Sequence, residues 1–149
     1  MNIKQLVIDL PCLIEVRGNA DTDILSLSAD SRKIEPGALF FCIRGIKVDA
    51  HQFAPQALAA GAAALVVERP LDVDAPQIVV SDARLAMNYI AQAFYGHPAR
   101  RMKMIGITGT KGKSTTCFLI KSILQQAGYK VGLIGTIMTM IGDKRLPSD

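Results

Sequence analysis

The chain has 149 residues, half of them hydrophobic, and a formal net charge of +4. This length suits one ordinary domain or two small ones with a buried core. No apolar run approaches the ~20 residues of a membrane span, and Asp9 in the first ten residues is atypical of a signal peptide. We therefore predict a protein that has no membrane partner.

The cysteines and histidines point to no metal site or disulfide framework. Cys12, Cys42 and Cys117 are odd in number, widely spaced and set in apolar surroundings. Such cysteines are typical of reduced core thiols in a cytoplasmic protein. His51 and His97 lie far apart, so that no zinc motif is visible.

Charge is distributed unevenly along the chain. Residues 1–98 hold eight basic and eleven acidic residues, whereas residues 99–149 hold nine basic and two acidic ones. A basic nucleic-acid surface is one explanation of the second segment. Aromatic residues are few there and no nucleic-acid motif appears, so we predict no nucleic-acid partner.

The first 98 residues are predicted to alternate strands with helices, which is typical of an α/β fold. Predicted strands cover residues 12–16, 24–28, 38–43, 62–67 and 77–80. Predicted helices cover residues 3–9, about 51–60 with Asp49 as the cap and Gly61 at the end, and from Ser81 or Asp82 to Tyr95. The dipeptide Pro36-Gly37 predicts a turn.

A domain boundary is predicted at residues 98–101, where composition and charge sign change. Residues 1–98 then form a small domain, and residues 99–149 begin a second one. In the second, a strand from Met104, a helix over residues 113–127 and a strand over residues 129–135 predict a right-handed βαβ unit. Residues 137–141 and the turn Gly142-Asp143 predict a hairpin.

The glycine-rich stretch over residues 104–116 reads Met-Ile-Gly-Ile-Thr-Gly-Thr-Lys-Gly-Lys-Ser-Thr-Thr. A phosphate at a strand–helix junction needs glycines for close backbone approach, the free N–H groups of the helix, a lysine, and a hydroxyl for Mg²⁺. Gly109, Gly112, Lys113 and Ser114 have the required spacing. Ile107 stands where the usual P-loop pattern has its first glycine, so the stretch is a variant of that motif.

One βαβ unit does not make a nucleotide-hydrolysing domain, because a parallel sheet needs further strands and helices on both faces. Residues 99–149 contain no later strand that ends in an acid for Mg²⁺, no catalytic base and no second lysine site. We therefore expect them to be the opening part of a larger P-loop ATPase domain, cut short. Exposed strand edges and apolar faces then predict self-association or mobility of this segment.

Two motifs resemble the Mur ligase family. The loop Gly-Ile-Thr-Gly-Thr-Lys-Gly-Lys-Ser-Thr-Thr from Gly106 is similar to that family's ATP loop, in which the missing first glycine is the norm. Asp30-Ser31-Arg32, followed by Pro-Gly-Ala-Leu-Phe-Phe from Pro36 and Ile-Arg-Gly from Ile43, resembles the substrate block of its E and F members. The start Thr-Gly-Thr favours the E type, and the resemblance extends over the whole chain.

The resemblance implies an ATP-dependent amide ligase of peptidoglycan synthesis. Such enzymes join meso-diaminopimelate or L-lysine to UDP-N-acetylmuramoyl-L-alanyl-D-glutamate through an acyl phosphate, with ATP and Mg²⁺ as cofactors. Residues 1–98 would bind the UDP end of the substrate, and residues 99–149 would begin the central ATP-binding domain. We expect the 149-residue chain to be inactive alone, because amine capture and ATP positioning need further residues.

The resemblance also implies a set of site residues. Lys113 would be catalytic, through the transferring phosphoryl group, and Ser114 would bind Mg²⁺. Thr116 is assigned equally to phosphate contact and to packing, and Lys111 is better explained as solvated than as a second phosphate contact. The implied ATP-loop residues are Gly109, Thr110, Lys111, Gly112, Lys113, Ser114 and Thr115. The implied UDP-substrate residues are Ala29, Ser31, Ile46, Lys47 and Val48.

Some roles stay open at the level of sequence. Arg32 is better explained as structural support than as a ligand contact, and Asp30 as an acceptor for turn N–H groups. The sequence departs from the family at Ala38, Ala50, Lys111 and Ser114, and none of these changes removes a donor that the chemistry needs. An F-type ligase, which uses a tripeptide substrate, and a non-catalytic UDP-sugar-binding module are the alternatives.

Overall fold

The computed structural model describes residues 1–46 and 48–146. The chain separates into two compact units, unit 1 (Met1–Met102) and unit 2 (Lys103–Asp149). The elements in chain order are α1 (Ile3–Leu6), β1 (Leu13–Arg17), β2 (Ser26–Ser28), β3 (Ala38–Phe41), η1 (Ala50–Phe53), α2 (Ala54–Ala59), β4 (Ala64–Val67), β5 (Gln77–Val80), α3 (Ala83–Phe94), η2 (Pro98–Arg101), α4 (Lys113–Gln126), β6 (Gly132–Ile134), β7 (Thr139–Ile141) and β8 (Lys144–Leu146).

Unit 1 is built on a five-stranded mixed sheet with the strand order β1-β5-β4-β3-β2. Strands β2, β3, β4 and β5 are parallel to one another. Strand β1 lies at one edge and runs antiparallel to β5. The α/β fold predicted for residues 1–98 is confirmed. Because four consecutive strands point the same way, the loops that follow them gather at one edge of the sheet.

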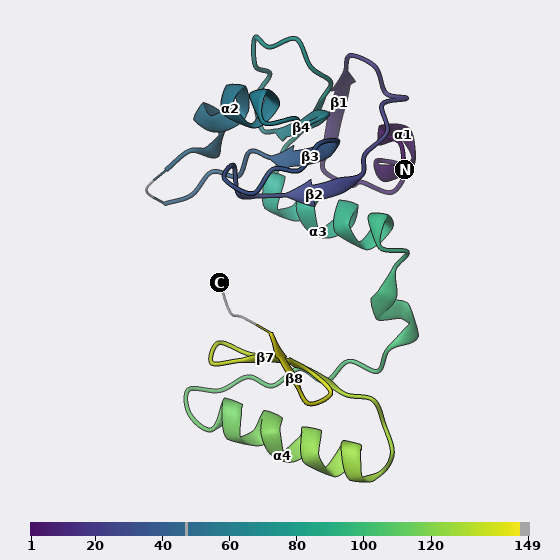
Figure 1. Cartoon of the computed structure of the whole chain (residues 1–149), viewed down its shortest axis with the longest axis vertical. Coiled ribbons are helices and arrows are strands. Elements are labelled where there is room, and N and C mark those ends of the chain that lie inside the picture. The colour runs from purple at the N-terminus through teal and green to yellow at the C-terminus, as the bar shows by residue number, and fades with distance from the viewer. Residues whose placement is uncertain (47, 147–149) are drawn as a thin grey trace. The chain divides into compact units, whose positions relative to one another are not determined.

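Both faces of this sheet are covered, so β3 and β4 are apolar throughout, and β5 carries one buried polar residue, Gln77. Side chains of a strand alternate between the two faces. Leu39 and Phe41 pack in the cluster that includes α1 and α3, whereas Phe40 and Cys42 pack in the cluster that includes α2. Figure 1 shows α2 and α3 on opposite sides of the sheet.

The predicted helices of unit 1 are present, although α1 ends at Leu6 and not at residue 9. The Asp49 carboxylate accepts the N–H of His51 and begins η1, which continues into α2. Asp82, rather than Ser81, caps α3 by accepting the N–H groups of Arg84 and Leu85 at 2.9 Å. These caps satisfy donors that the first helical turn leaves free.

Unit 2 corrects one prediction. Residues 104–109, all of them described, form no strand, and β6 pairs antiparallel with β7 rather than in parallel. The βαβ unit is therefore absent from the described residues, although its helix α4 and the hairpin of β7 and β8 are present. A strand exists only where a neighbour completes its hydrogen bonds, and β6 finds that neighbour in the segment just after it.

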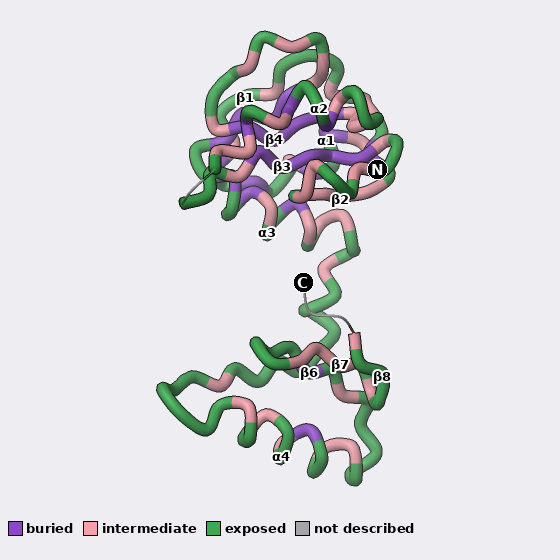
Figure 2. The backbone as a smooth tube through the Cα atoms, turned by 60° about the vertical axis from the view of Figure 1, so that its left-hand side comes forward, coloured by how far each residue is buried: buried purple, intermediate pink, exposed green. Residues whose placement is uncertain are grey.

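Burial differs sharply between the units. The buried apolar residues of unit 1 form two clusters on its sheet, whereas Leu133 and Lys121 are the only buried residues among those described in unit 2. Figure 2 shows the contrast along the tube. Of the described helices, none is long and apolar enough to cross a membrane.

Candidate functional site

The carboxyl edge of the unit 1 sheet gathers the predicted UDP-substrate residues. Ser28 of β2 is in register with Phe40 of β3, so the loops that follow these two strands emerge side by side. The first loop carries Ala29 and Ser31, and the second carries Ile46 and Val48. The carboxyl ends of parallel strands are where open α/β sheets hold ligands. Lys47, the fifth predicted residue, lies outside the described residues.

These residues differ in exposure. The side chain of Ile46 is fully exposed and that of Val48 is 48% exposed, although both are apolar. Ala29 is exposed and Ser31 is half-buried. Exposed apolar side chains on a loop at this edge can cover a ligand without any strand or helix moving.

The loop after β2 is stabilised by an ion pair. Arg32 donates from Nε to Asp30 Oδ1 at 2.9 Å and from Nη2 to Oδ2 at 2.8 Å, and its backbone N–H also reaches Oδ1. The Arg32 side-chain hydrogen bonds hold the pKa of Asp30 well below its usual range. Ser28 Oγ donates to the Asp30 carbonyl oxygen at 3.0 Å. The prediction that Asp30 accepts a turn N–H is confirmed. The ion pair agrees with a supporting role for Arg32, which stays a prediction.

The loop after β3 is short and closed by its own backbone. The N–H of Gly45 donates to the Val48 carbonyl oxygen at 2.9 Å, and Arg44 and Asp49 form an isolated antiparallel bridge. A Cβ atom at residue 45 would lie 2.9 Å from that carbonyl oxygen, which is closer than real side chains allow. Glycine is therefore required at this position for the loop to close.

A buried histidine that the sequence reasoning left without a role lies beside this loop. His51 is 3% exposed; its Nδ1 lies 2.6 Å from Asp49 Oδ1, and its Nε2 accepts the N–H of Glu68 at 3.0 Å. Arg69 also pairs with Asp49 at 3.0 Å. The His51 backbone and side-chain hydrogen bonds lower the pKa of Asp49. The only local sequence signal of this cluster is the Asp-x-His spacing of Asp49 and His51. Glu68 and Arg69 are remote from these two residues in the sequence.

Burial raises the pKa of the Cys42 thiol, which is close enough to Asp49 to be affected by its charge. Desolvation, assisted by the negative charge of Asp49, raises the pKa of Cys42 to about 12. Burial also raises the pKa of Cys12. Both are free, buried thiols as predicted, whereas Cys117 is only half-buried. The described residues contain no cluster of His, Cys, Asp or Glu that could hold a metal ion.

The glycine loop of unit 2 has two glycines with positive φ and leads into a helix that has no side-chain cap. Gly109 and Gly112 have φ values of 150° and 77°, which side chains other than glycine's rarely adopt. Gly112 then precedes the first residue of α4, where it leaves the helix N–H groups without a side-chain cap. Free N–H groups and the positive end of a 14-residue helix favour an anion at this end.

The side chains of the loop are accessible. Lys113 Nζ donates to the Gly109 carbonyl oxygen at 2.6 Å, which holds the ammonium group over the loop. Lys113 and Ser114 line a cavity of about 200 Å³ together with Ile107. Thr110, Lys111 and Thr115 are exposed and outside that lining.

Thr116 belongs to the helix rather than to the cavity. Its hydroxyl donates to the Gly112 carbonyl oxygen at 3.0 Å, four residues back, and its own N–H bonds to the same oxygen. This is the back-bonding typical of threonine in a helix. The Thr116 side chain is exposed, and both of its interpretations, phosphate contact and packing, stay predictions.

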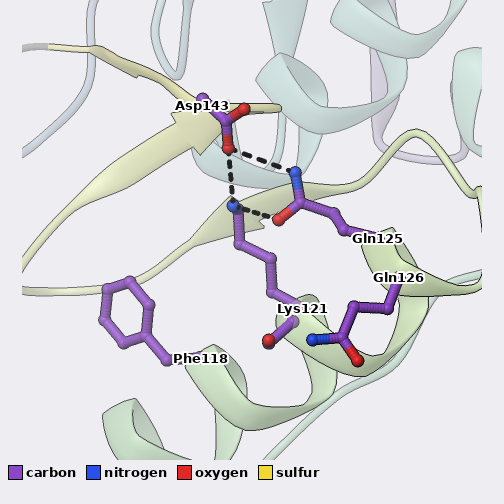
Figure 3. A pocket seen from close by; sticks show the side chains of 6 residues that line it. Phe118, Lys121, Gln125, Gln126 and Asp143 are labelled. Atoms are coloured by element: carbon purple, nitrogen blue, oxygen red, sulfur yellow. Dashed lines mark hydrogen bonds and ion pairs between the residues drawn. The ribbon is translucent and has the colours of Figure 1, made fainter.

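A second, wider cavity of about 500 Å³ lies between α4 and the β7–β8 turn. Lys121, 6% exposed, donates to Gln125 Oε1 at 2.5 Å and lies 3.7 Å from Asp143. Gln125 Nε2 also reaches the Asp143 carboxylate, and Figure 3 shows the three side chains converging while Phe118 lies along the cavity wall. This cluster joins the helix to the hairpin turn and explains how a lysine is buried in unit 2.

Comparisons with known proteins agree with the fold. Residues 23–97 match the family model described as Mur ligase family, catalytic domain. The chain is 49% identical over 148 residues to the UDP-N-acetylmuramoyl-L-alanyl-D-glutamate--2,6-diaminopimelate ligase of Geobacillus thermodenitrificans, covering 99% of this chain and 30% of that protein. It is 42% identical over 146 residues to the same-named ligase of Listeria innocua, with coverages of 98% and 30%.

Solved structures show the same relationship. The structure of a UDP-N-acetylmuramoyl-L-alanyl-D-glutamate--2,6-diaminopimelate ligase matches 99% of this chain and 30% of its own, at 26% identity and a TM-score of 0.71. A MurF structure from Acinetobacter baumannii matches 84% of this chain and 27% of its own, at 33% identity and a TM-score of 0.70. The chain thus spans about 30% of the length of the curated relatives it matches. From the family model, which covers half of its residues, and from these relatives, the chain belongs to the Mur ligase family.

Proposed function

We propose that the chain works as part of an ATP-dependent ligase that joins 2,6-diaminopimelate to UDP-N-acetylmuramoyl-L-alanyl-D-glutamate in peptidoglycan synthesis. The observation that carries the proposal is the 49% identity over 148 residues to a ligase whose name states this reaction. Diaminopimelate is preferred over L-lysine because the relatives are named for it. We also propose that the protein acts in the cytoplasm.

Unit 1 is the proposed binding site for the UDP end of the substrate. Ala29, Ser31, Ile46 and Val48 lie on adjacent loops at the carboxyl edge of its parallel strands, which supports this assignment. Ser31 supplies a hydroxyl and Ala29 a backbone group. The apolar side chains of Ile46 and Val48 can pack on a ring, and Lys47 is proposed to lie near the diphosphate.

Unit 2 is the proposed start of the ATP-binding domain. The fit rests on the open backbone of Gly109 and Gly112, the uncapped start of α4 and the position of Lys113 over the loop. ATP with Mg²⁺, when bound, supplies the phosphoryl group that activates the substrate carboxylate. With that group bound, Lys113 and the loop N–H groups would stabilise negative charge, Ser114 would hold the metal, and Thr110, Lys111 and Thr115 would line the outer loop.

Lys113 changes partner in this proposal. Its ammonium group donates to the Gly109 carbonyl oxygen, and a phosphate oxygen is a stronger, charged acceptor. The lysine therefore exchanges a neutral acceptor for an anionic one while the loop keeps its shape.

A chimera tests the proposal. The chain replaces the segment that it matches in the Geobacillus thermodenitrificans relative, and ADP release is measured with and without diaminopimelate. We expect release that depends on diaminopimelate, abolished by Lys113→Ala and retained by Lys130→Ala, an exposed lysine beyond the far end of α4. Release that ignores diaminopimelate, or that survives Lys113→Ala, contradicts the proposal. The 149-residue chain alone should catalyse no ligation.

Two other functions have some support. An F-type ligase is suggested by solved MurF structures that are 33% identical to this chain. Calorimetry with the 149-residue chain distinguishes it, because an F-type chain should bind the UDP-linked tripeptide more tightly than the dipeptide. A non-catalytic UDP-sugar-binding module is suggested by the larger core of unit 1. Calorimetry with UDP-N-acetylmuramoyl-dipeptide and with ATP-Mg²⁺ separates the last case, because binding of the first ligand alone supports the module.

A further inference from the structure

The hydrogen bonds of His51 fix the tautomer of its neutral ring and the orientation of that ring. The Glu68 backbone N–H can only donate, so Nε2 must be the acceptor of that 3.0 Å contact. The ring proton of the neutral form therefore lies on Nδ1, where it donates to Asp49 Oδ1 at 2.6 Å. A side chain that is 1% exposed is held at both nitrogens and cannot rotate without losing one bond.

Asp49 connects this histidine to the proposed UDP-substrate loop. One carboxylate oxygen, Oδ1, accepts both the backbone N–H and the Nδ1 proton of His51, while Oδ2 pairs with Arg69. Asp49 also forms the backbone bridge to Arg44 that closes the base of the loop. The position of the Asp49 main chain therefore sets the spacing of the two loop ends, between which Gly45 bonds to Val48.

Glu68 continues the connection to the next strand. It follows β4 directly, its N–H binds His51, and its Oε1 accepts the N–H of Ala83 at the start of α3 at 3.0 Å. The exit loops of β3, β4 and β5 are thus tied in series along the carboxyl edge of the sheet. An aspartate alone would cap η1; the histidine adds a second donor to its carboxylate at Nδ1, and the contact of Nε2 with Glu68 orients the ring for it.

We propose that His51 is a positioning residue for the UDP end of the substrate: through Asp49 it holds residues 44–46 and 48 in the conformation that binds. The inference rests on the proposed UDP-substrate function of unit 1. His51 itself touches no ligand in this account. It removes the entropy cost of ordering the loop when the ligand binds, which is the usual benefit of preorganisation.

Two substitutions separate the two ends of the imidazole. In His51→Asn the amide N–H₂ occupies the place of Nδ1 and can still donate to Asp49. In His51→Gln the longer amide reaches the place of Nε2 and can still accept from Glu68, while the donor to Asp49 is lost. Gln77→Leu is the control, because Gln77 is buried and hydrogen-bonded to Leu71 at the opposite, amino-terminal end of the parallel strands.

The experiment uses the 149-residue chain and two readouts. Calorimetry measures the affinity for UDP-N-acetylmuramoyl-L-alanyl-D-glutamate, and NMR hydrogen exchange measures protection of the Gly45 amide without ligand. We expect His51→Gln to lose about tenfold or more in affinity, which corresponds to about 1.4 kcal/mol of binding free energy. We also expect the Gly45 amide to exchange faster in this variant. His51→Asn should stay near the wild-type chain in both readouts. Gln77→Leu should lower the melting temperature but leave affinity and Gly45 exchange unchanged.

The outcomes are distinct. Equal affinity and equal Gly45 exchange in all variants overturns the proposal. Loss of affinity in Gln77→Leu in proportion to its stability also overturns it, because the effect is then general destabilisation. If the wild-type chain does not bind the UDP ligand, the proposed function of unit 1 fails. In that case the exchange rate of the Gly45 amide still tests whether His51 holds the loop. Faster exchange in His51→Gln, but not in His51→Asn or Gln77→Leu, supports this role of His51.

Discussion

Single side chains at the carboxyl edge of unit 1 stabilise the loops that carry the proposed ligand contacts. Asp30 and Asp49 each sit at a loop base, and each accepts hydrogen bonds from a residue two positions later in the chain. The difference lies in their surroundings. Arg32, the partner of Asp30, is 82% exposed, whereas His51, the partner of Asp49, is buried. An exposed ion pair contributes little stability, so the Asp30 pair orders its loop rather than the fold.

The titration of Asp30 tests this interpretation. Its pKa is lowered in the folded chain mainly by the side-chain hydrogen bonds of Arg32, so the small contribution of this pair to stability is fully present above the ordinary aspartate pKa. That contribution is lost as pH falls through the lowered pKa. We expect Arg32→Ala to raise the Asp30 pKa toward its usual value, as measured by NMR titration of the carboxyl carbon. Lys4→Ala, which removes the pair with Asp21, is the control. An unchanged Asp30 pKa in Arg32→Ala would contradict this account.

Glycines after two helices of unit 1 let the chain turn into the next element, which is β4 after α2 and η2 after α3. Gly61 follows α2 with a φ of 105°, and a Cβ atom there would lie 3.2 Å from Pro36 Cα. Gly96 follows α3 with a φ of 69° and has no other atom within 4 Å of a built Cβ. Both positions disfavour a side chain, but only the first is also crowded by backbone.

These two positions form a matched pair of substitutions. We expect Gly96→Ala to lower the free energy of unfolding of unit 1 by about 1 kcal/mol, the cost of a left-handed residue. Gly61→Ala should cost about 2–3 kcal/mol, because its φ lies outside the left-handed well and Pro36 must shift as well. Urea unfolding followed by circular dichroism measures both. An equal loss in the two variants would show that crowding at Pro36 does not matter.

At the same scale, the sequence predicted the elements that are fixed by local chemistry. The cap at Asp82, the glycine at 61 and the apolar run of β3 each carry their signal within a few residues, and each is confirmed. The strand predicted from Met104 is wrong, because its residues favour extended structure but no described neighbour pairs with them. A high β-propensity means that a segment can pack against a neighbouring strand. The sequence of the segment does not tell which neighbour, if any, will pair with it.

The candidate site shows the same limit. The glycine spacing and Lys113 are local signals, and the structure brings Lys113 and Ser114 to one cavity. The His51 cluster depends on Glu68, which bonds to His51, and on Arg69, which pairs with Asp49. Both reach the cluster only because β4 lies next to β3 in the sheet. Nothing near residue 51 indicates either partner. The role of Lys121, which needs Asp143 from the hairpin turn, is hidden from the sequence for the same reason.

At the scale of the whole molecule, the two units differ in what holds them together. Unit 1 buries apolar side chains on both faces of a five-stranded sheet. In the described part of unit 2, α4 and a three-stranded meander bury a single apolar side chain, Leu133, while Ile134 and Ile137 are 86% and 68% exposed. A small antiparallel sheet with one buried apolar residue gains little from burial, and its exposed apolar residues favour association with another surface.

Hydrogen exchange at two protein concentrations tests this contrast. Amides of β4 should exchange only with global unfolding of unit 1, because they are hydrogen-bonded between two strands in a buried layer. Amides over residues 130–141 should exchange faster by a factor of about 100 or more at low concentration, which corresponds to a local opening free energy about 3 kcal/mol lower. Their protection should rise with concentration if the exposed isoleucines pair two copies. Strong protection of residues 130–141 in a chain that sedimentation shows to be monomeric would contradict the prediction, because the meander would then be stable without any covering surface.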